Sequence, residues 1–262
     1  MLSICKHELK LNLKSLLIWS FSVGGLGFIC LLMYTSMDGE MMDMADTFSN
    51  MGAFSDAFGM STLSIATING FFATEVGTVH GLGSALFAAL LSTVLLSKEE
   101  DAHTGEFLFS LPLSRGNIVL AKLLSLLIEL TLFTLICGVM YILGFAVLKE
   151  DISWNEMMIF LGSMLFMNIE ISAIALIISA CSARNRMGVG LGLALIFYSY
   201  DLIGRVVPDM KDYLFVGPFS YTNASEIFAG KETPAEALIT GVAVTVIALI
   251  ISFAVYTKKD LA

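Results

Sequence analysis

Six long stretches of the chain are almost entirely apolar, and short polar stretches separate them. Each has about 20 residues or more, which is the length an α-helix needs to cross the hydrocarbon core of a bilayer. The stretches lack the alternation of apolar and polar positions that marks the strands of a membrane barrel. The pattern therefore predicts an all-α integral membrane protein with six transmembrane helices, at about residues 16–36, 76–97, 118–148, 157–181, 187–206 and 235–256.

Residues 1–15 alternate apolar side chains with lysines and a histidine. This pattern predicts an N-terminal amphipathic interfacial helix that leads directly into the first span. A cleaved signal peptide is the alternative, but the apolar stretch is too long for one and no small-x-small cleavage site closes it. Gly24, Gly25 and Gly27 in this stretch suit close helix packing instead.

Composition supports a membrane protein with a single transmembrane domain over residues 1–262. Apolar residues make up 57% of the chain and charged residues only 14%, and the mean hydropathy is +0.85, values far from those of a soluble domain. Only residues 37–75 and 207–234 are long enough to hold extra structure outside the bilayer, and both are expected to be outer loops. Residues 98–117 form the longest of the remaining connections.

Lysines and arginines set the expected orientation, because they accumulate in the cytoplasmic loops of membrane proteins. With the N-terminus inside, only four of the fourteen basic residues fall outside. The ten expected inside are Lys6, Lys10, Lys14, Lys98, Arg115, Lys122, Arg184, Arg186, Lys258 and Lys259. We therefore expect a multi-pass protein of the cell (plasma) membrane with both termini in the cytoplasm.

The cytoplasmic segment 98–117, KEEDAHTGEFLFSLPLSRGN, is charged and yet carries an apolar run at its centre. Pro112 and the glycines predict one or two helical turns. Phe-Leu-Phe-Ser-Leu is more apolar than a solvated loop requires, which favours a docking surface over an ordinary connector. The charged residues of the segment are expected to lie closer to water than the apolar ones.

The same segment resembles the permease subunits of ABC transporters of the ABC-2 exporter type. The resemblance lies in an acidic pair after the second span, a Thr-Gly and Glu, an LP-x-SR element and a basic residue, here Lys122, in the next span. His103 precedes Thr104-Gly105, where Gly-Thr order is expected in the family. Residues 53–75 and the C-terminal YTKKDLA are also similar to family members.

The resemblance implies a permease that pairs with a second copy, as a homodimer, and with two ABC ATP-binding subunits. The 98–117 segment would then dock on the ATPase and transmit its closure. The residues that the resemblance assigns to this coupling role are Glu99, Glu100, Thr104, Gly105, Glu106, Phe107, Phe109, Leu111, Pro112 and Arg115. No cofactor is expected in this chain, and ATP and Mg would bind the partner ATPase.

Other motif searches argue against an enzyme, so no catalytic residue is expected. The chain has no G-x-x-x-x-G-K-[ST] phosphate loop, so ATP hydrolysis must come from another chain. Its four cysteines have no C-x-x-C spacing and its three histidines are scattered, so no metal site is expected. The methionines of the first outer loop are better read as adaptable apolar side chains than as soft-metal ligands. Membrane lipids are expected partners, and nucleic acid is not.

Three acids fall inside predicted spans, where a carboxylate costs about 2.5 kcal/mol or more. These are Glu129, Glu170 and Asp201. They either line an export path or make hydrogen bonds between helices, and the sequence leaves both open. For Glu170, the deepest by count, the candidate partners are Asn168, Ser172, Tyr198 and Tyr200.

Gly188 and Gly192 form a G-x-x-x-G pair, which predicts a close helix contact within one subunit or between two. The expected function is transport of an amphipathic peptide or lipid-like substrate out of the cytoplasm, by analogy with small peptide-export and immunity permeases. The alternative from another class is an ion-coupled secondary transporter or channel that uses the intramembrane carboxylates.

Overall fold

The computed structural model confirms an all-α membrane protein. It describes residues 1–36, 45, 47–105 and 113–259, and this part of the chain contains helices and no strand. Six described helical stretches are long and apolar enough to cross a membrane. They are α1 (Leu2–Ser36), Ile68–Leu95, α8 (Arg115–Leu148), α9 (Trp154–Cys181), α10 (Met187–Val206) and α12 (Ala235–Lys258).

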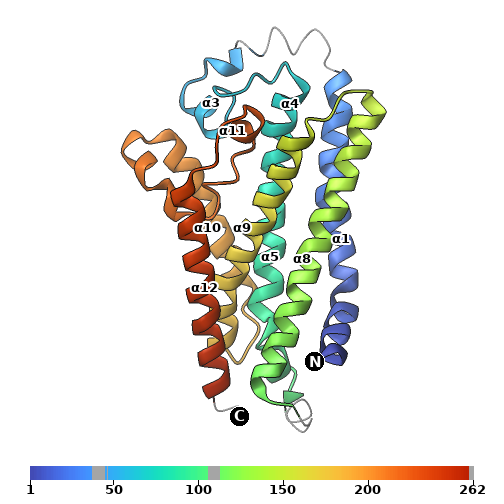
Figure 1. Ribbon diagram of the computed structural model, residues 1–262, viewed down its shortest axis with the longest axis vertical. Helices are drawn as coiled ribbons and strands as arrows, with labels where there is room; N and C mark the ends of the chain where they lie inside the picture. Colours follow the sequence, from blue (N-terminus) through green and yellow to red (C-terminus); the bar gives the residue numbers. More distant parts are fainter. Residues whose placement is uncertain (37–44, 46, 106–112, 260–262) are drawn as a thin grey trace.

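The crossing helices run side by side, so the bundle has two distinct ends (Figure 1). The start of α1 and the end of α12 lie together at the lower end in Figure 1, which we call the terminal end. The opposite end, which we call the far end, carries the short helices α3 (Ala53–Phe58), α4 (Ile68–Phe71) and α11 (Ala224–Phe228). An even number of crossings requires both termini to lie at one end, as the sequence predicted.

The second crossing stretch begins eight residues earlier than its apolar run indicated. Thr67 caps α4, because its hydroxyl accepts a hydrogen bond from the Gly70 amide at 3.1 Å. A π-helical turn, η1 (Phe72–Val76), then joins α4 to α5 (Gly77–Leu95). The hydropathy pattern did not indicate residues 68–75 as part of the span, because Asn69, Thr74 and Glu75 are polar. Phe72 holds it in place, with its ring 5.2–5.6 Å from four others, those of Tyr141, Phe145, Phe160 and Phe228.

The N-terminal residues 2–15 lead directly into the first span, as expected, and the two form one 35-residue helix, α1. Its buried positions form one stripe that runs from Glu8 through Leu16 and Ser20 to Leu31. From Leu16 on, these positions recur every three or four residues, and the half-buried Asn12 lies midway between Glu8 and Leu16, as expected for a single helix face. The polar members of the stripe pack against other helices, so the N-terminal half of α1 belongs to the bundle.

The crossing helices pack in two groups, which are joined by contacts of α1 with α5 and of α8 with α9 and α12. In one group α1 lies along α8, and in the other α9 lies between α5 and α12 while α10 packs on α5. Gly24 and Gly27 permit the first contact: a Cβ on Gly24 would lie 2.8 Å from Met140 Sδ, and one on Gly27 would lie 2.5 Å from Tyr141 Cε1. Larger residues at these two positions would separate α1 from α8.

The segment 207–234, expected as an outer loop, is packed into the bundle. It contains the 3₁₀-helix η2 (Pro208–Val216), the buried turn residues Phe219 and Tyr221, and α11. Pro208 is the first residue of η2 and prevents α10 from continuing. A Cβ on Gly204 of α10 would clash with Leu214 of η2, so the two helices are in close contact. Most of residues 217–228 thus lie in the protein interior at the far end, whereas η2 has no buried residue.

Candidate functional site

The first candidate site is the 98–117 segment, which lies at the terminal end between α5 and α8. Its first residues form the short helix α6 (Lys98–Asp101). Glu106, Phe107, Phe109, Leu111 and Pro112, all assigned to coupling from the sequence, lie outside the described residues. The structure does describe Glu99, Glu100, Thr104, Gly105 and Arg115.

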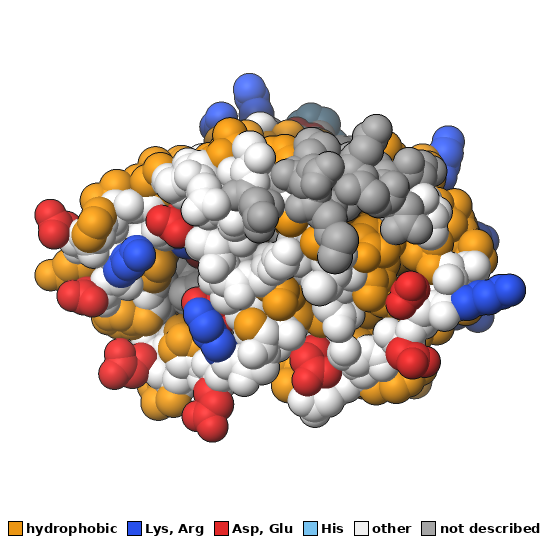
Figure 2. All heavy atoms as spheres, turned by 90° about the horizontal axis from the view of Figure 1, so that it is seen from above, with side chains coloured by type: hydrophobic (Ala, Val, Ile, Leu, Met, Phe, Trp, Pro, Cys, Tyr) orange, Lys and Arg blue, Asp and Glu red, His pale blue; other side chains and the backbone are white. Residues whose placement is uncertain are grey.

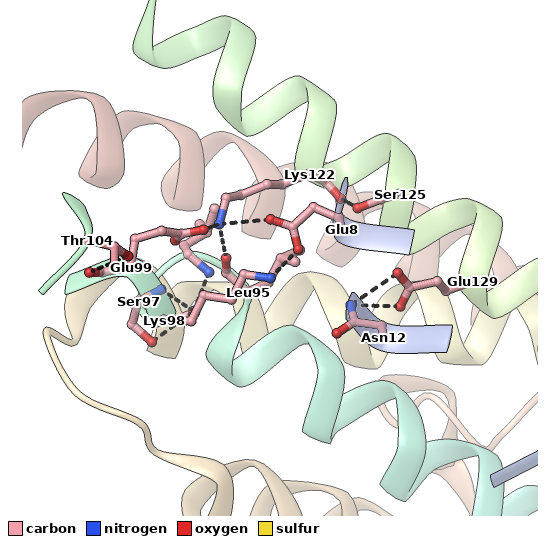
Figure 3. A network of polar contacts seen from close by, with 12 residues as sticks. Glu8, Asn12, Leu95, Ser97, Lys98, Glu99, Thr104, Lys122, Ser125 and Glu129 are labelled. Carbon is pink, nitrogen blue, oxygen red and sulfur yellow. Dashed lines mark hydrogen bonds and ion pairs between the residues drawn. The ribbon is translucent and has the colours of Figure 1, made fainter. Parts of the chain in front are cut away.

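Lys122 of α8 is the centre of a polar network that holds α6 against the bundle (Figure 3). Its side chain is completely buried. The ammonium group donates to Glu99 Oε1 at 2.5 Å and to the Leu95 carbonyl oxygen at 2.6 Å. Leu95 ends α5, so Lys122 satisfies a carbonyl that has no partner within its own helix. One lysine therefore binds both the end of α5 and the helix that follows it.

Glu8 brings α1 into the same network. It is 2% exposed, pairs with Lys98 of α6, and lies with its Oε1 3.5 Å from Lys122 Nζ. One turn along α1, Asn12 donates to both carboxylate oxygens of Glu129 on α8 at 3.1 Å. Residues four apart share a helix face, so α1 presents both polar side chains to α8 and α6 (Figure 3). This is the physical reason that the N-terminal half of α1 does not lie apart from the bundle.

Helix α9 anchors the same junction from its own side. Ser179 Oγ accepts hydrogen bonds from the backbone amides of Leu96 at 2.9 Å and Ser97 at 3.2 Å. These amides lie between α5 and α6, where a helical hydrogen-bond ladder is interrupted. The start of the 98–117 segment is therefore held by α1, α8 and α9 together.

The other end of the segment is fixed to α12. Arg115 Nη1 donates to the carbonyl oxygens of Lys259 at 2.5 Å and Thr257 at 3.4 Å. Arg115 thereby binds carbonyl groups at the end of α12 that have no partner within the helix. Lys259 in turn pairs with Glu100 at 2.8 Å and donates to the Ser182 carbonyl at 2.9 Å. A Cβ on Gly116 would lie 3.0 Å from Phe253, so α8 and α12 approach closely at this level.

For Glu99 and Glu100, these contacts differ from the expectation that the charged residues of the segment lie closer to water than the apolar ones, whereas Asp101 is exposed. The side chains of Glu99 and Glu100 are only 16% and 9% exposed, and their partners are lysines of this same chain. The hydropathy pattern could not show this, because Lys122 and Lys259 are distant in sequence. Removing one partner from a buried ion pair of this kind strongly destabilises the folded protein, because the other charge stays buried without a partner.

The Thr104-Gly105 pair follows a break in the backbone. Helix α6 ends at Asp101, and His103 has a positive φ of 53°. The Thr104 amide then donates to the Glu99 carbonyl at 2.8 Å. A non-glycine residue rarely adopts this left-handed conformation. The departure from the family's residue order therefore coincides with the end of the helix.

The three intramembrane acids have three separate environments. Glu129 faces α1 through Asn12. Glu170 accepts a hydrogen bond from Tyr221 of the 207–234 segment at 2.6 Å, and a Cβ on Gly241 of α12 would lie 2.8 Å from its Oε2. The partner is thus none of the four residues that the sequence suggested. Burial, followed by the nearby Glu170 carboxylate, raises the pKa of Tyr221, so its phenol stays protonated and donates.

Asp201 lies nearer the far end of the bundle. It is 3% exposed and pairs with Arg205, one turn further along α10, at 2.6 Å. Arg205 also donates to the Ala57 carbonyl at 3.4 Å, which ties α10 to α3. Each of the three acids therefore has a partner of its own, and within the described residues no hydrogen bond or ion pair links one of them to another.

Gly188 and Gly192 make no close contact within the described part of the subunit, since nothing lies within 4 Å of a Cβ added at either. Gly190, on another face of α10, is the residue that packs closely: an added Cβ would lie 3.0 Å from the Ala89 carbonyl oxygen and would clash with Thr93. The contact between two subunits stays a prediction for the G-x-x-x-G pair.

Sequence reasoning missed Glu8, Lys259 and Tyr221 as members of these sites. For Glu8 a signal was present, because it is the only acid among the first 36 residues and lies between lysines. Lys259 lies in the C-terminal YTKKDLA that is similar to family members, but neither it nor Tyr221 carried a signal that indicated its partner. Their partners come from helices that are distant in sequence.

A family model described as ABC-2 family transporter protein matches residues 2–261 of the chain. The match covers nearly the whole sequence, including every helix of the bundle and both ends of the polar network. Among curated proteins, none matches the chain.

Proposed function

The chain belongs to the ABC-2 family of transporter proteins, and from this premise we propose that it is the permease of an ATP-driven exporter of an amphipathic peptide or lipid-like substrate. As an ABC-2 permease it is a multi-pass membrane protein that acts with an ATP-binding subunit. The proposed complex contains two copies of that subunit and a second copy of this chain. ATP and Mg would bind the ATPase chains.

The observation that carries the proposal is that both ends of the 98–117 segment are bound to transmembrane helices. At its start, Glu99 binds Lys122 of α8, and Lys98 binds Glu8 of α1. At its end, Arg115 binds the last carbonyls of α12. A protein that pushes or pulls on this segment therefore moves α1, α8 and α12 with it.

Short, buried, charge-assisted contacts suit such a role. Hydrogen bonds between ionised groups are stronger than neutral ones and fix the geometry of their partners. Because Lys122 is fully buried and holds both α5 and α6, α6 cannot tilt without displacing α5 or α8. We infer that closure of two ATPase subunits reaches the membrane through these contacts.

The proposed orientation places the terminal end in the cytoplasm. The ten basic residues expected inside lie on helices or connections at this end: the first half of α1, α6, the start of α8, the α9–α10 connection and the end of α12. The remaining four basic residues lie toward the far end: Lys149, Arg205, Lys211 and Lys231. This distribution supports a cytoplasmic terminal end, and the ATPase would then bind on the side that supplies ATP.

A charge-exchange experiment on Glu100 and Lys259 tests the coupling role. The full-length permease is purified with its ATP-binding subunit in nanodiscs, and both the recovery of the subunit and the ATPase rate are measured. Glu100→Lys and Lys259→Glu should each lower the permease-dependent part of the ATPase rate at least threefold. The double exchange should restore most of it, because the pair at 2.8 Å is formed again with its charges reversed.

Lys6→Glu is the matched control, since Lys6 is an exposed lysine at the same end. It should leave the ATPase rate unchanged. If the double exchange did not recover activity beyond either single variant, the Glu100–Lys259 contact would have no part in coupling. Equal loss in the Lys6 variant would also contradict the proposal.

Transport itself is tested in proteoliposomes with a fluorescent amphipathic peptide and a fluorescent lysolipid as probes. ATP added to complexes whose terminal end faces outward should drive one of the probes into the lumen. Uptake that needs an ion gradient and no ATP would instead show the secondary-transporter mechanism.

A further inference from the structure

A polar pocket opens at the far end of the bundle, beside the end of α10. It has a volume of about 350 Å³, and its walls come from α10, α3, η2 and the region of α11. Figure 2 shows this end of the molecule, with acidic and basic side chains interleaved around a hollow in the left half of the view. Binding pockets for small ligands are typically about 300–1,000 Å³, so this one suits a headgroup better than a whole amphiphile.

The basic side of the pocket is built on a buried charge pair. Asp201 and Arg205 line the pocket and pair at 2.6 Å, while Arg205 retains 18% exposure of its side chain. A guanidinium has five N–H donors, and Asp201 and the Ala57 carbonyl account for only part of them. Lys211 of η2 adds an exposed ammonium and forms no ion pair within the part of the chain that the structure describes. Anionic oxygens would find donors here.

The acidic side of the pocket lies toward α11 and the start of α12. Glu226 lines the pocket and pairs with Lys231 at 3.4 Å, a loose contact that leaves both side chains exposed. A second hollow shares Lys211, Ser220 and Glu226 with the pocket, and adds the acids Asp212 and Glu236 without a further base. An ammonium group would be attracted to this side.

The pocket lies next to a surface with the character of a membrane interface. Tyr213 and Val216 of η2 are 63% and 52% exposed. Tyr200 of α10 donates to the Tyr213 carbonyl at 2.7 Å, so η2 lies against α10, whose Ile196 and Ile203 are also exposed. Exposed tyrosines beside a lipid-facing helix are typical of the depth at which lipid headgroups lie.

We propose that this pocket binds the zwitterionic headgroup of an amphiphile, with its anionic group at Arg205 and Lys211 and its ammonium group toward Glu226. The three acids and three bases that line the pocket balance each other, so a ligand with both charges gains contacts on both sides. The chain of the amphiphile would remain in the leaflet, beside η2 and α10. The site requires neither ATP nor transport, so its test is independent of the proposed exporter.

The test is equilibrium binding of radiolabelled lysophosphatidylethanolamine to the full-length permease in maltoside micelles. We expect one bound molecule per chain. Unlabelled lysophosphatidylethanolamine should compete at least tenfold better than lysophosphatidylglycerol, an alkyl trimethylammonium or a monoacylglycerol. Soluble glycerophosphoethanolamine distinguishes the sources: competition equal to that of the lysolipid indicates a free zwitterion as ligand, and weaker competition indicates a membrane lipid.

Variants connect the binding to the pocket. Lys211→Glu should weaken binding at least fivefold, whereas Lys149→Glu, at an exposed lysine of the far end outside the pocket, should not. Arg205→Gln alone leaves Asp201 buried without its partner, so the double variant Asp201→Asn with Arg205→Gln is used, and it too should weaken binding. Equal competition by all four amphiphiles, preference for the cationic one, or the same affinity in both lysine variants would overturn the proposal.

Discussion

At the scale of residues, a few charged side chains are buried in the bundle, and each is paired there with a group of opposite charge or a hydrogen-bond partner. Lys122 has no exposed surface, yet it contacts two carboxylates and a helix-terminal carbonyl. An uncompensated buried charge is expensive, so each member of this network makes the burial of the others possible. Glu170 and Tyr221 are a smaller case of the same principle, with a single hydrogen bond.

Replacing Lys122 should therefore destabilise the protein more than replacing another lysine of the terminal end. Lys122→Met leaves Glu8 and Glu99 close together without a shared cation, and we expect a loss of about 3–5 kcal/mol. Lys10→Met, at an exposed position on α1, should change stability by about 0.5 kcal/mol or less. Thermal unfolding of the two variants in the same detergent makes the comparison, and equal melting temperatures would show that the network adds little.

Tyr221→Phe tests the second contact. The change keeps the ring and removes only the donor to Glu170, so a buried carboxylate loses its hydrogen bond at a cost of about 1–3 kcal/mol. Tyr213→Phe, at an exposed tyrosine of the same segment, is the control and should have no effect. If Glu170 instead lines a path, Glu170→Gln should change the substrate-stimulated ATPase rate while thermal stability stays close to that of the wild type.

At the scale of elements, glycines decide which helix faces can touch. Gly24 and Gly27 let α1 approach α8, and Gly190 lets α10 approach α5. Gly188 and Gly192 belong to the same helix as Gly190 but have open space beside them. A row of glycines therefore gives α10 two distinct surfaces, one used within the subunit and one left available.

The three glycines of α10 form a matched set of variants. Gly190→Val should destabilise the folded subunit, because its side chain would meet Thr93 and the Ala89 carbonyl. Gly192→Val should leave the melting temperature of the monomer unchanged and, if the G-x-x-x-G pair lies between two subunits, should weaken the dimer in a crosslinking assay. An unchanged dimer in both the Gly188 and Gly192 variants would remove these glycines from the interface.

At the scale of the whole molecule, the two ends of the bundle differ in charge and in construction. The terminal end has most of the basic residues and the network that binds the 98–117 segment. The far end has a folded-back segment and a pocket that is lined by side chains of both charges. A single cycle of transport would have to connect these two ends through the helices between them.

The orientation of the bundle can be measured with two single cysteines. Lys231→Cys, in a background without the four native cysteines, should react in intact cells with an impermeant thiol reagent. The native Cys181, an exposed residue at the terminal end, retained as the only cysteine should react only after the membrane is opened. The reverse result would place the 98–117 segment outside the cell and would contradict an ATPase-coupling role for it.

Apolar runs alone were sufficient to predict six crossing helices, because a helix that spans hydrocarbon must be apolar over about 20 residues whatever it packs against. Because the number of runs is even, they also predicted that both termini lie at the same end. The uneven distribution of basic residues then predicted which end faces the cytoplasm. The acidic pair Glu99 and Glu100 and the following Arg115 were recognisable as a motif before their contacts were known. The orientation in the membrane and the coupling role of these residues remain predictions from the sequence.

Only the tertiary structure decided which side chains meet. A hydropathy pattern can show which face of a helix is apolar but not which helix that face will contact, so the rotation of α1 that turns Glu8 toward Lys122 could not be predicted from it. The same holds for Tyr221, which reaches Glu170 because the 207–234 segment folds back into the bundle. The bilayer determines where each membrane helix forms, because each must be apolar over its own length. Which helices then contact one another depends on close packing and hydrogen bonds between them.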